Sequence, residues 1–140
     1  MYYKKILVPL DGSDNAALAC RHAVALAADG RLELVLLHCY GDLPATIGGR
    51  ARDEMIAASE EEGRILMAPC VRHCEENGVK CKALVRSGGP GRTIVMVAQA
   101  EGCDLIVMGS RGLSDFSGMV MGSVSHRVLR HATMPILIVR

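Results

Sequence analysis

The chain has very few aromatic side chains, no tryptophan, and no excess of charge of either sign. Its 140 residues include one Phe and three Tyr, and its 16 basic residues are balanced by 15 acidic ones, which leaves a net charge of +1. Single strands of nucleic acid are bound on aromatic stacking platforms, and duplexes are bound by strongly positive surfaces. The composition therefore argues against a nucleic-acid partner and against an anionic membrane surface.

Long hydrophobic runs are absent as well. No stretch approaches the roughly 18 apolar residues that cross a membrane. The apolar run between Lys5 and Asp11 is too short for the central region of a signal peptide. We therefore expect a cytoplasmic protein with no membrane partner. The six cysteines, several of them inside apolar runs, are then expected to be reduced thiols.

Short apolar runs alternate with helix-like segments along the whole chain. We expect strands at residues 5–10, 32–38, 79–85, 104–109 and 135–139, and helices at residues 14–28, 51–77, 90–101 and 123–131. Strands that alternate with helices form a parallel sheet with helices on both faces, so the pattern predicts one doubly wound α/β domain over residues 1–140. The run at 79–86 alternates apolar and basic residues, which predicts a half-solvated edge strand.

The end of the first expected strand carries a carboxylate. Open parallel sheets bind ligands beyond the carboxyl ends of their strands. The stretch "VPLDGSD" places Asp11 there, where it can accept hydrogen bonds from ribose hydroxyls or an adenine amine. Asp11 or Ser13 is equally suited to capping the helix that follows, and both interpretations stay open at this stage.

The strand expected at residues 104–109 is followed by a glycine-rich loop that leads into a helix. The loop has glycines at positions 109, 112, 118 and 122, and the helix begins near Ser123. Glycine permits a positive φ and a close approach of backbone to ligand, and a helix N-terminus offers unpaired N–H groups to an anion. Ser123 and Ser125 add hydroxyl groups, and Arg111 adds a cation. The segment therefore predicts a phosphate-binding loop.

The sequence supports neither a second nucleotide-binding motif nor a zinc site. The chain has no G-x-x-x-x-G-K-[ST] motif, and "GGPGRTI" at residues 88–94 has Ile94 where a dinucleotide motif needs its third glycine, so a helix start at Pro90 is favoured. Cys70, His73 and Cys74 share one helix face, and Cys81 follows on the next strand. Because the paired spacing of a closed zinc site is missing, we expect structural thiols and no metal.

The spacing Gly109-x2-Gly112-x9-Gly122-Ser123 resembles the G-x2-G-x9-G-[ST] signature of the ATP-binding branch of the universal stress protein family. The segments "KKILVPLDGSDNA", "LLHC" and "HATMPILIVR" are similar to the first, second and last strands of that family, so the resemblance covers essentially the whole chain. It implies a five-stranded sheet of order 3-2-1-4-5, the adenine nucleotide alpha hydrolase-like fold. It also implies a homodimer formed through the C-terminal strand.

The resemblance further assigns binding residues by position. Around adenine and ribose it places Pro9, Asp11 and Cys39, with Met108 under the nucleoside. Around the phosphates it places Gly109, Arg111, Gly112, Gly122, Ser123, Val124 and Ser125. The implied cofactor is ATP. Asp115 in the same loop would repel phosphate, so it either points away or meets the phosphate through Mg²⁺.

The function that the resemblance implies is a nucleotide-dependent module for stress response or signalling. The sequence has no Ser/His/Asp arrangement and no lysine in the phosphate loop, so we assign no catalytic residues. At most, slow ATP hydrolysis or autophosphorylation is expected. The alternatives are a slow ATPase or autophosphorylating enzyme and a dimeric interaction module that binds no nucleotide.

Overall fold

The structure is a computed structural model, and it describes residues 3–112 and 121–140. The elements in chain order are β1 (Lys5–Pro9), α1 (Asp14–Ala27), β2 (Glu33–Tyr40), α2 (Gly49–Glu76), β3 (Cys81–Ser87), α3 (Pro90–Ala100), β4 (Leu105–Gly109), α4 (Ser123–His131) and β5 (Ile136–Val139). Each strand and helix expected from the sequence is present, with its ends shifted by a few residues at most. Asp115 and Gly118 lie outside the described residues.

The five strands form one parallel sheet in the order β3-β2-β1-β4-β5. In the centre, β1 pairs with β2 from Lys5↔Glu33 to Pro9↔Leu37 and with β4 from Ile6↔Leu105. The chain runs outward from β1 through β2 to β3, and then crosses to the other side of β1. The carboxyl ends of β1 and β4 are therefore next to each other at the point where the strand order reverses. The predicted fold class and strand order are confirmed.

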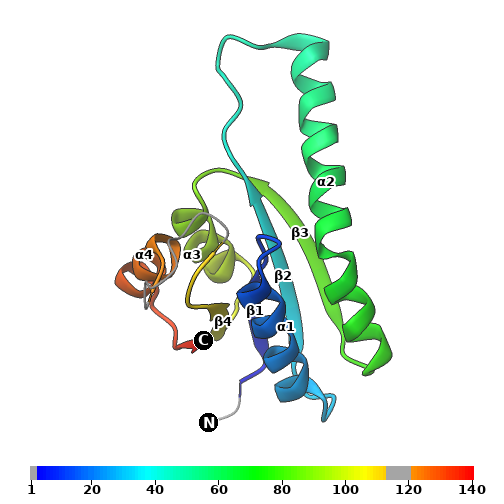
Figure 1. The fold of residues 1–140 in the computed structure, drawn as a ribbon, viewed down its shortest axis with the longest axis vertical. Helices are drawn as coiled ribbons and strands as arrows, with labels where there is room; N and C mark the ends of the chain where they lie inside the picture. The colour runs from blue at the N-terminus through cyan, green and yellow to red at the C-terminus, as the bar shows by residue number, and fades with distance from the viewer. Residues whose placement is uncertain (1–2, 113–120) are drawn as a thin grey trace.

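Two hydrophobic clusters cover the two faces of the sheet. Ile6 and Val8 of β1 face α1 and α2, whereas Leu7 faces α3 and α4. Figure 1 shows the two pairs of helices on either side of the sheet. Strands buried on both faces need apolar residues at successive positions, which explains the continuous run in β1. At the sheet edge, β3 instead exposes Lys82 and Arg86, as its alternating pattern predicts.

The helix ends follow the local sequence signals. Gly30, Gly78 and Gly102 lie just after α1, α2 and α3 and have φ values of 78°, 67° and 70°, as expected for left-handed residues that end a helix. Pro90 occupies the first turn of α3, where its missing N–H costs nothing.

The helix α2 extends beyond the sheet. Its buried residues are Gly63, Met67, Cys70 and Cys74, so the turns before Gly63 bury no side chain. Figure 1 shows this first part of α2 and the segment that precedes it projecting away from the rest of the molecule. Within residues 3–112 and 121–140, no helix is both long and apolar enough to cross a membrane.

A disulfide joins α1 to α2 and corrects one expectation. We expected all six cysteines to be reduced, but Cys20 and Cys70 are bonded, with their Cα atoms 6.4 Å apart. The two helices lie against the same face of the sheet and bring together residues that are 50 positions apart in the sequence. Cys39, Cys74, Cys81 and Cys103 remain free thiols. Cys70 therefore contributes to the structure through a disulfide, and the expectation that it is a free structural thiol is wrong.

The bridge predicts a measurable loss of stability on reduction. Closing a loop of this length restricts the unfolded chain, and by the chain-entropy relation we expect its removal to lower the free energy of unfolding by about 4 kcal/mol. Urea unfolding with and without reductant measures this difference. In the Cys20→Ser variant, reductant should no longer move the midpoint. Six rather than four alkylated cysteines in unreduced, denatured protein would contradict the bridge.

Candidate functional site

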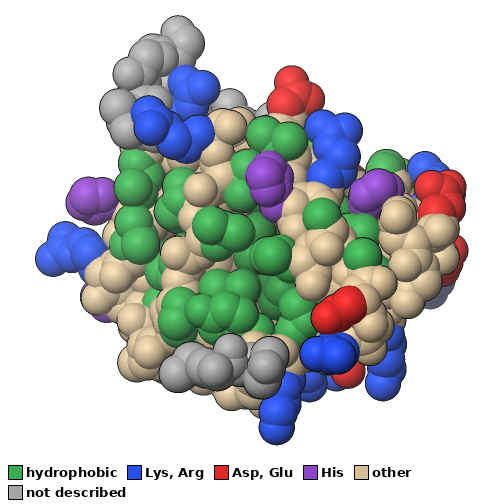
Figure 2. Space-filling model, turned by 90° about the horizontal axis from the view of Figure 1, so that it is seen from below, with side chains coloured by type: hydrophobic (Ala, Val, Ile, Leu, Met, Phe, Trp, Pro, Cys, Tyr) green, Lys and Arg blue, Asp and Glu red, His purple; other side chains and the backbone are tan. Residues whose placement is uncertain are grey.

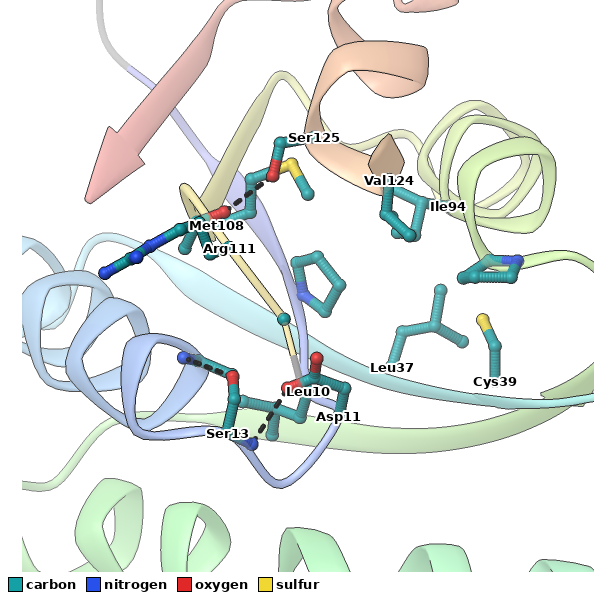
Figure 3. A pocket seen from close by; sticks show the side chains of 15 residues that line it. Leu10, Asp11, Ser13, Leu37, Cys39, Ile94, Met108, Arg111, Val124 and Ser125 are labelled. Atoms are coloured by element: carbon teal, nitrogen blue, oxygen red, sulfur yellow. Dashed lines mark hydrogen bonds between the residues drawn. The ribbon is translucent and has the colours of Figure 1, made fainter. Parts of the chain in front are cut away.

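A cavity of about 230 Å³ lies at the point where the strand order reverses. Its lining comes from the ends of β1, β2 and β4 and from the beginnings of α1, α3 and α4 (Figure 3). The lining residues are Pro9, Leu10, Asp11, Ser13, Ala16, Leu37, Cys39, Pro90, Ile94, Met108, Gly109, Arg111, Gly112, Val124 and Ser125. Segments from the two halves of the chain thus meet in one site, as the topology of an open parallel sheet favours.

A tight turn between β1 and α1 presents Asp11 to this cavity. Gly12 has a φ of 86°, which a residue with a side chain rarely adopts. The Asp11 carboxylate accepts a hydrogen bond from the Ser13 N–H at 2.9 Å, and the Ser13 hydroxyl accepts one from the Ala16 N–H at 3.1 Å. Ser13 is therefore the cap of α1, and Asp11 braces the turn and lines the cavity. The capping interpretation is therefore confirmed for Ser13, and the contact of Asp11 with a ribose stays a prediction.

The end of β4 is enclosed between α1 and α4. A Cβ on Gly109 would lie 2.8 Å from the Asn15 Cβ and 2.9 Å from the Asn15 carbonyl carbon, so only glycine allows α1 to come this close. From the other side, the Ser125 hydroxyl donates a hydrogen bond to the Gly109 carbonyl at 2.8 Å. The Gly122 N–H donates to the Ser110 carbonyl. These contacts hold the beginning of α4 against the strand end.

The reason for two of the signature glycines differs from the one expected. The sequence suggested positive φ angles, but Gly122 has a φ of −80°, and Gly109 also lies outside the left-handed region. A positive φ is therefore not the reason for glycine at these two positions, and the close approach of backbone to a ligand stays a prediction. Gly109 is required by the space that Asn15 occupies, and Gly122 is the extended residue just before α4, where no side chain caps the helix. The backbone N–H groups of the first turn are left without a side-chain partner from the cap.

The cavity differs in polarity from one end to the other. Figure 3 shows Leu37, Cys39, Ile94 and Val124 grouped at one end and Arg111 at the other, with Asp11 between them. Burial raises the pKa of the Cys39 thiol to about 11, so it is uncharged at neutral pH and contributes an apolar surface. The apolar end of the cavity suits a flat apolar group, the middle near Asp11 suits a hydroxylated group, and the end near Arg111 suits an anion.

Most of the residues named from the sequence line this cavity. Gly122 and Ser123 do not; they line a neighbouring hollow with His126 and Arg127, immediately before Val124 and Ser125 on α4. Six further lining residues were not named: Leu10, Ser13, Ala16, Leu37, Pro90 and Ile94. A signal for Leu37 existed, because it precedes Cys39 by two residues and so shares its face of β2. Pro90 and Ile94 were interpreted only as the start of a helix.

The structure also bears on the zinc alternative. In the part of the chain that the structure describes, no group of three or more His, Cys, Asp or Glu side chains is arranged to hold a metal ion. Cys70 is bonded to Cys20 and has no thiolate to offer. Burial, and to a lesser extent the neighbouring Cys81, raises the pKa of Cys74 to about 12.

Comparison with known proteins gives a consistent family. The sequence profile described as the universal stress protein family matches residues 2–140. The universal stress protein YxiE of Bacillus subtilis is 35% identical over 147 aligned positions, which cover 99% of each chain. The universal stress protein MJ0577 of Methanocaldococcus jannaschii is 30% identical, with 99% of this chain and 95% of the relative covered.

Solved structures agree with these matches. The structure of MJ0577 superposes with a TM-score of 0.86 and 30% identity over 99% of this chain and 96% of that one. A universal stress protein crystallised in complex with cAMP has a TM-score of 0.72 and 25% identity, with 100% and 98% of the two chains covered. With its strand order, its glycine spacing and its full-length relatives all in agreement, the chain belongs to the universal stress protein family.

Proposed function

We propose that this chain binds an adenine nucleotide, ATP in the first place, and that nucleotide occupancy makes it a stress-response or signalling module of the cytoplasm. The observation that carries the proposal is the cavity at the strand-order reversal, in which an apolar end, a carboxylate and an arginine follow one another. The cAMP-bound relative supports an adenine nucleotide as the class of ligand.

The apolar end suits the base, and Asp11 suits the ribose. Leu37, Cys39 and Ile94 provide surfaces on which a flat ring packs, and the Asp11 carboxylate can accept hydrogen bonds from sugar hydroxyls. The cavity of about 230 Å³ is smaller than the roughly 300–1,000 Å³ of pockets that enclose a whole ligand. We therefore expect it to take at most the nucleoside, with the phosphates outside it.

The phosphates have a path toward the start of α4. Arg111 lines the cavity, and Gly122 and Ser123 line the adjoining hollow together with Arg127. The N-terminus of α4 attracts anions through its dipole and its uncapped N–H groups. Ser125 acts indirectly, because its hydroxyl proton is already donated to Gly109, whereas Ser123 is exposed. Mg²⁺ remains part of the proposal as a counter-ion to the phosphates.

Binding rather than chemistry is the role that these residues support. Among the residues that the structure describes, the cavity is lined by one arginine and by one carboxylate at the nucleoside end, but by no lysine and no histidine. The histidines of the adjoining hollow, His126 and His131, are exposed to solvent. General acid–base catalysis needs a titratable side chain within hydrogen-bond reach of the reacting group. We therefore propose that hydrolysis or autophosphorylation is slow, and steady-state turnover with Mg·ATP measures it.

Isothermal titration with ATP and adenosine tests the proposal. Asp11→Ala removes a charged hydrogen-bond acceptor at the nucleoside end, so it should weaken both ligands by about 2 kcal/mol. Ser123→Ala removes one hydroxyl at the phosphate end and should weaken ATP alone, by about 1–2 kcal/mol. The exposed carboxylate of Asp14 is the matched control, and Asp14→Ala should leave both affinities unchanged.

Wild-type protein that takes up neither ATP nor adenosine would falsify the nucleotide assignment. Mass analysis of small molecules released from denatured, freshly purified protein gives an independent result. An adenine nucleotide in stoichiometric amount supports the proposal. Its absence, together with the absence of binding, leaves the interaction module that binds no nucleotide as the function.

Cys39 provides a reporter within the cavity. Because burial raises its pKa to about 11, we expect slow alkylation near neutral pH and a rate that rises about tenfold per pH unit until the pH reaches that value. A saturating adenine nucleotide should slow the reaction further, because the base covers the thiol. Peptide mapping separates Cys39, which is partly buried, from Cys103, which is buried but lies outside this cavity and should react at the same rate with or without ligand.

We also propose that two copies pair through β5. In the described part of the sheet, β5 is bonded only to β4, and its Leu137 is 39% exposed. Figure 2 shows hydrophobic side chains gathered over the side of the molecule on which the termini lie. The opposite edge strand, β3, exposes Lys82 and Arg86, and such charges discourage pairing. The apolar edge is therefore the one suited to an antiparallel strand pair about a two-fold axis.

Sedimentation tests the dimer. Leu137→Glu places a charge on the exposed face of β5 and should convert dimers into monomers at tens of micromolar, a concentration at which an interface of about 1,000 Å² persists. Met96 is another exposed apolar residue, 55% exposed on α3, and Met96→Glu is the matched control. A monomeric wild type at this concentration contradicts the proposal.

A further inference from the structure

His38 lies next to the cavity residues in the sequence, yet on the opposite face of β2. Leu37 and Cys39 line the cavity, and the alternation of side chains along a strand turns His38 away from it. The imidazole instead lies against α2, where a Cβ on Gly63 would come within 3.0 Å of the His38 Cδ2 atom. His38 is partly buried in this position and is not among the residues that line the cavity.

The imidazole makes one specific hydrogen bond, to the backbone of Leu10. The His38 Nδ1 atom lies 2.8 Å from the Leu10 carbonyl oxygen. Because a carbonyl oxygen only accepts, Nδ1 carries the proton and donates it. The regular pairing of β1 with β2 ends at Pro9↔Leu37, and the Leu10 N–H donates to the Leu37 carbonyl at 2.7 Å. Both backbone polar groups of Leu10 are therefore held by successive residues of β2.

We propose that His38 is a positioning residue for Asp11. The Leu10 carbonyl and the Asp11 nitrogen belong to one rigid peptide plane, so fixing the carbonyl oxygen fixes the direction in which the chain enters Asp11. From there, the left-handed Gly12 and the hydrogen bond from the Ser13 N–H to Asp11 complete the turn. This inference rests on the proposed function and adds to it a residue outside both the cavity and the glycine signature.

The cover over His38 depends on a glycine of α2. A Cβ at residue 63 would lie 2.7 Å from the Val85 Cγ2 atom as well as close to His38, so glycine lets α2 approach β2 and β3 at this point. At this point α2 partly covers His38, and the His38–Leu10 hydrogen bond is partly buried. Water that competes for the Leu10 carbonyl would weaken the hydrogen bond by which His38 fixes the peptide plane.

A pair of substitutions separates this role from simple packing. Asparagine places an amide N–H near the position of Nδ1, whereas leucine fills similar space without a donor. We expect His38→Leu to weaken adenosine and ATP equally, by about fivefold to tenfold, the equivalent of one hydrogen bond. His38→Asn should stay within about twofold of wild type. His22 is exposed on α1, so His22→Leu is the matched control and should change neither affinity.

A double-mutant cycle tests whether the effect passes through Asp11. If it does, His38→Leu should cost nothing further in an Asp11→Ala background, because the group that it positions is gone. The proposal is overturned if His38→Asn loses as much affinity as His38→Leu. It is also overturned if His38→Leu has its full effect in the Asp11→Ala background.

A measurement on the protein without ligand distinguishes failure of this inference from failure of the proposed function. Nitrogen-15 NMR of the wild type should find the His38 proton on Nδ1. Exchange of the Ser13 amide hydrogen should be slow in wild type and His38→Asn, and at least several-fold faster in His38→Leu. Unchanged exchange in all three proteins refutes the positioning role, whether or not the wild type binds an adenine nucleotide.

Discussion

The close approach of α1 to the end of β4 is the constraint on which the candidate site depends. With 2.8 Å between the Asn15 Cβ and the place where a Gly109 Cβ would lie, the beginning of α1 rests directly on the last residue of the strand. Asp11 and Ser13 precede that helix, and Arg111 follows that strand, so the contact sets the separation of the carboxylate from the cation. Any side chain at position 109 pushes these two sides of the cavity apart.

The fold class could be predicted from hydrophobic patterning because the packing on both faces of the sheet depends on that patterning. Strands buried on two faces need unbroken apolar runs, and β3 at the edge needs only an alternating one. Patterning does not give the full order of the strands, however, because it distinguishes the alternating edge strand from the others but does not rank the strands with continuous apolar runs. The order 3-2-1-4-5 came from the resemblance carried by the glycine spacing, and the structure has that order.

What the sequence could not predict depends on contacts between distant segments. Cys20 and Cys70 have no local signal of pairing, because their separation of 50 residues is bridged only when two helices pack on the same face. Pro90 and Ile94 belong to the cavity because α3 begins beside β2, a relation that a helix-start motif does not contain. The glycines at 109 and 122 were recognised correctly as a pattern, but Gly109 is required by the space that Asn15 occupies, and Gly122 is the extended residue before α4 and has a negative φ.

The disulfide and the expected compartment constrain each other. Disulfides are rare in a reducing cytosol, where those that form are usually transient or redox-sensing. A cytoplasmic location therefore implies that the Cys20–Cys70 pair alternates between a disulfide and two free thiols. An oxidising compartment instead implies a permanent disulfide. Where the bridge is formed, it joins α1 to the packed half of α2, the half that also covers His38. The helix that holds this hydrogen bond in place is thus tied to the helix that begins at the candidate site.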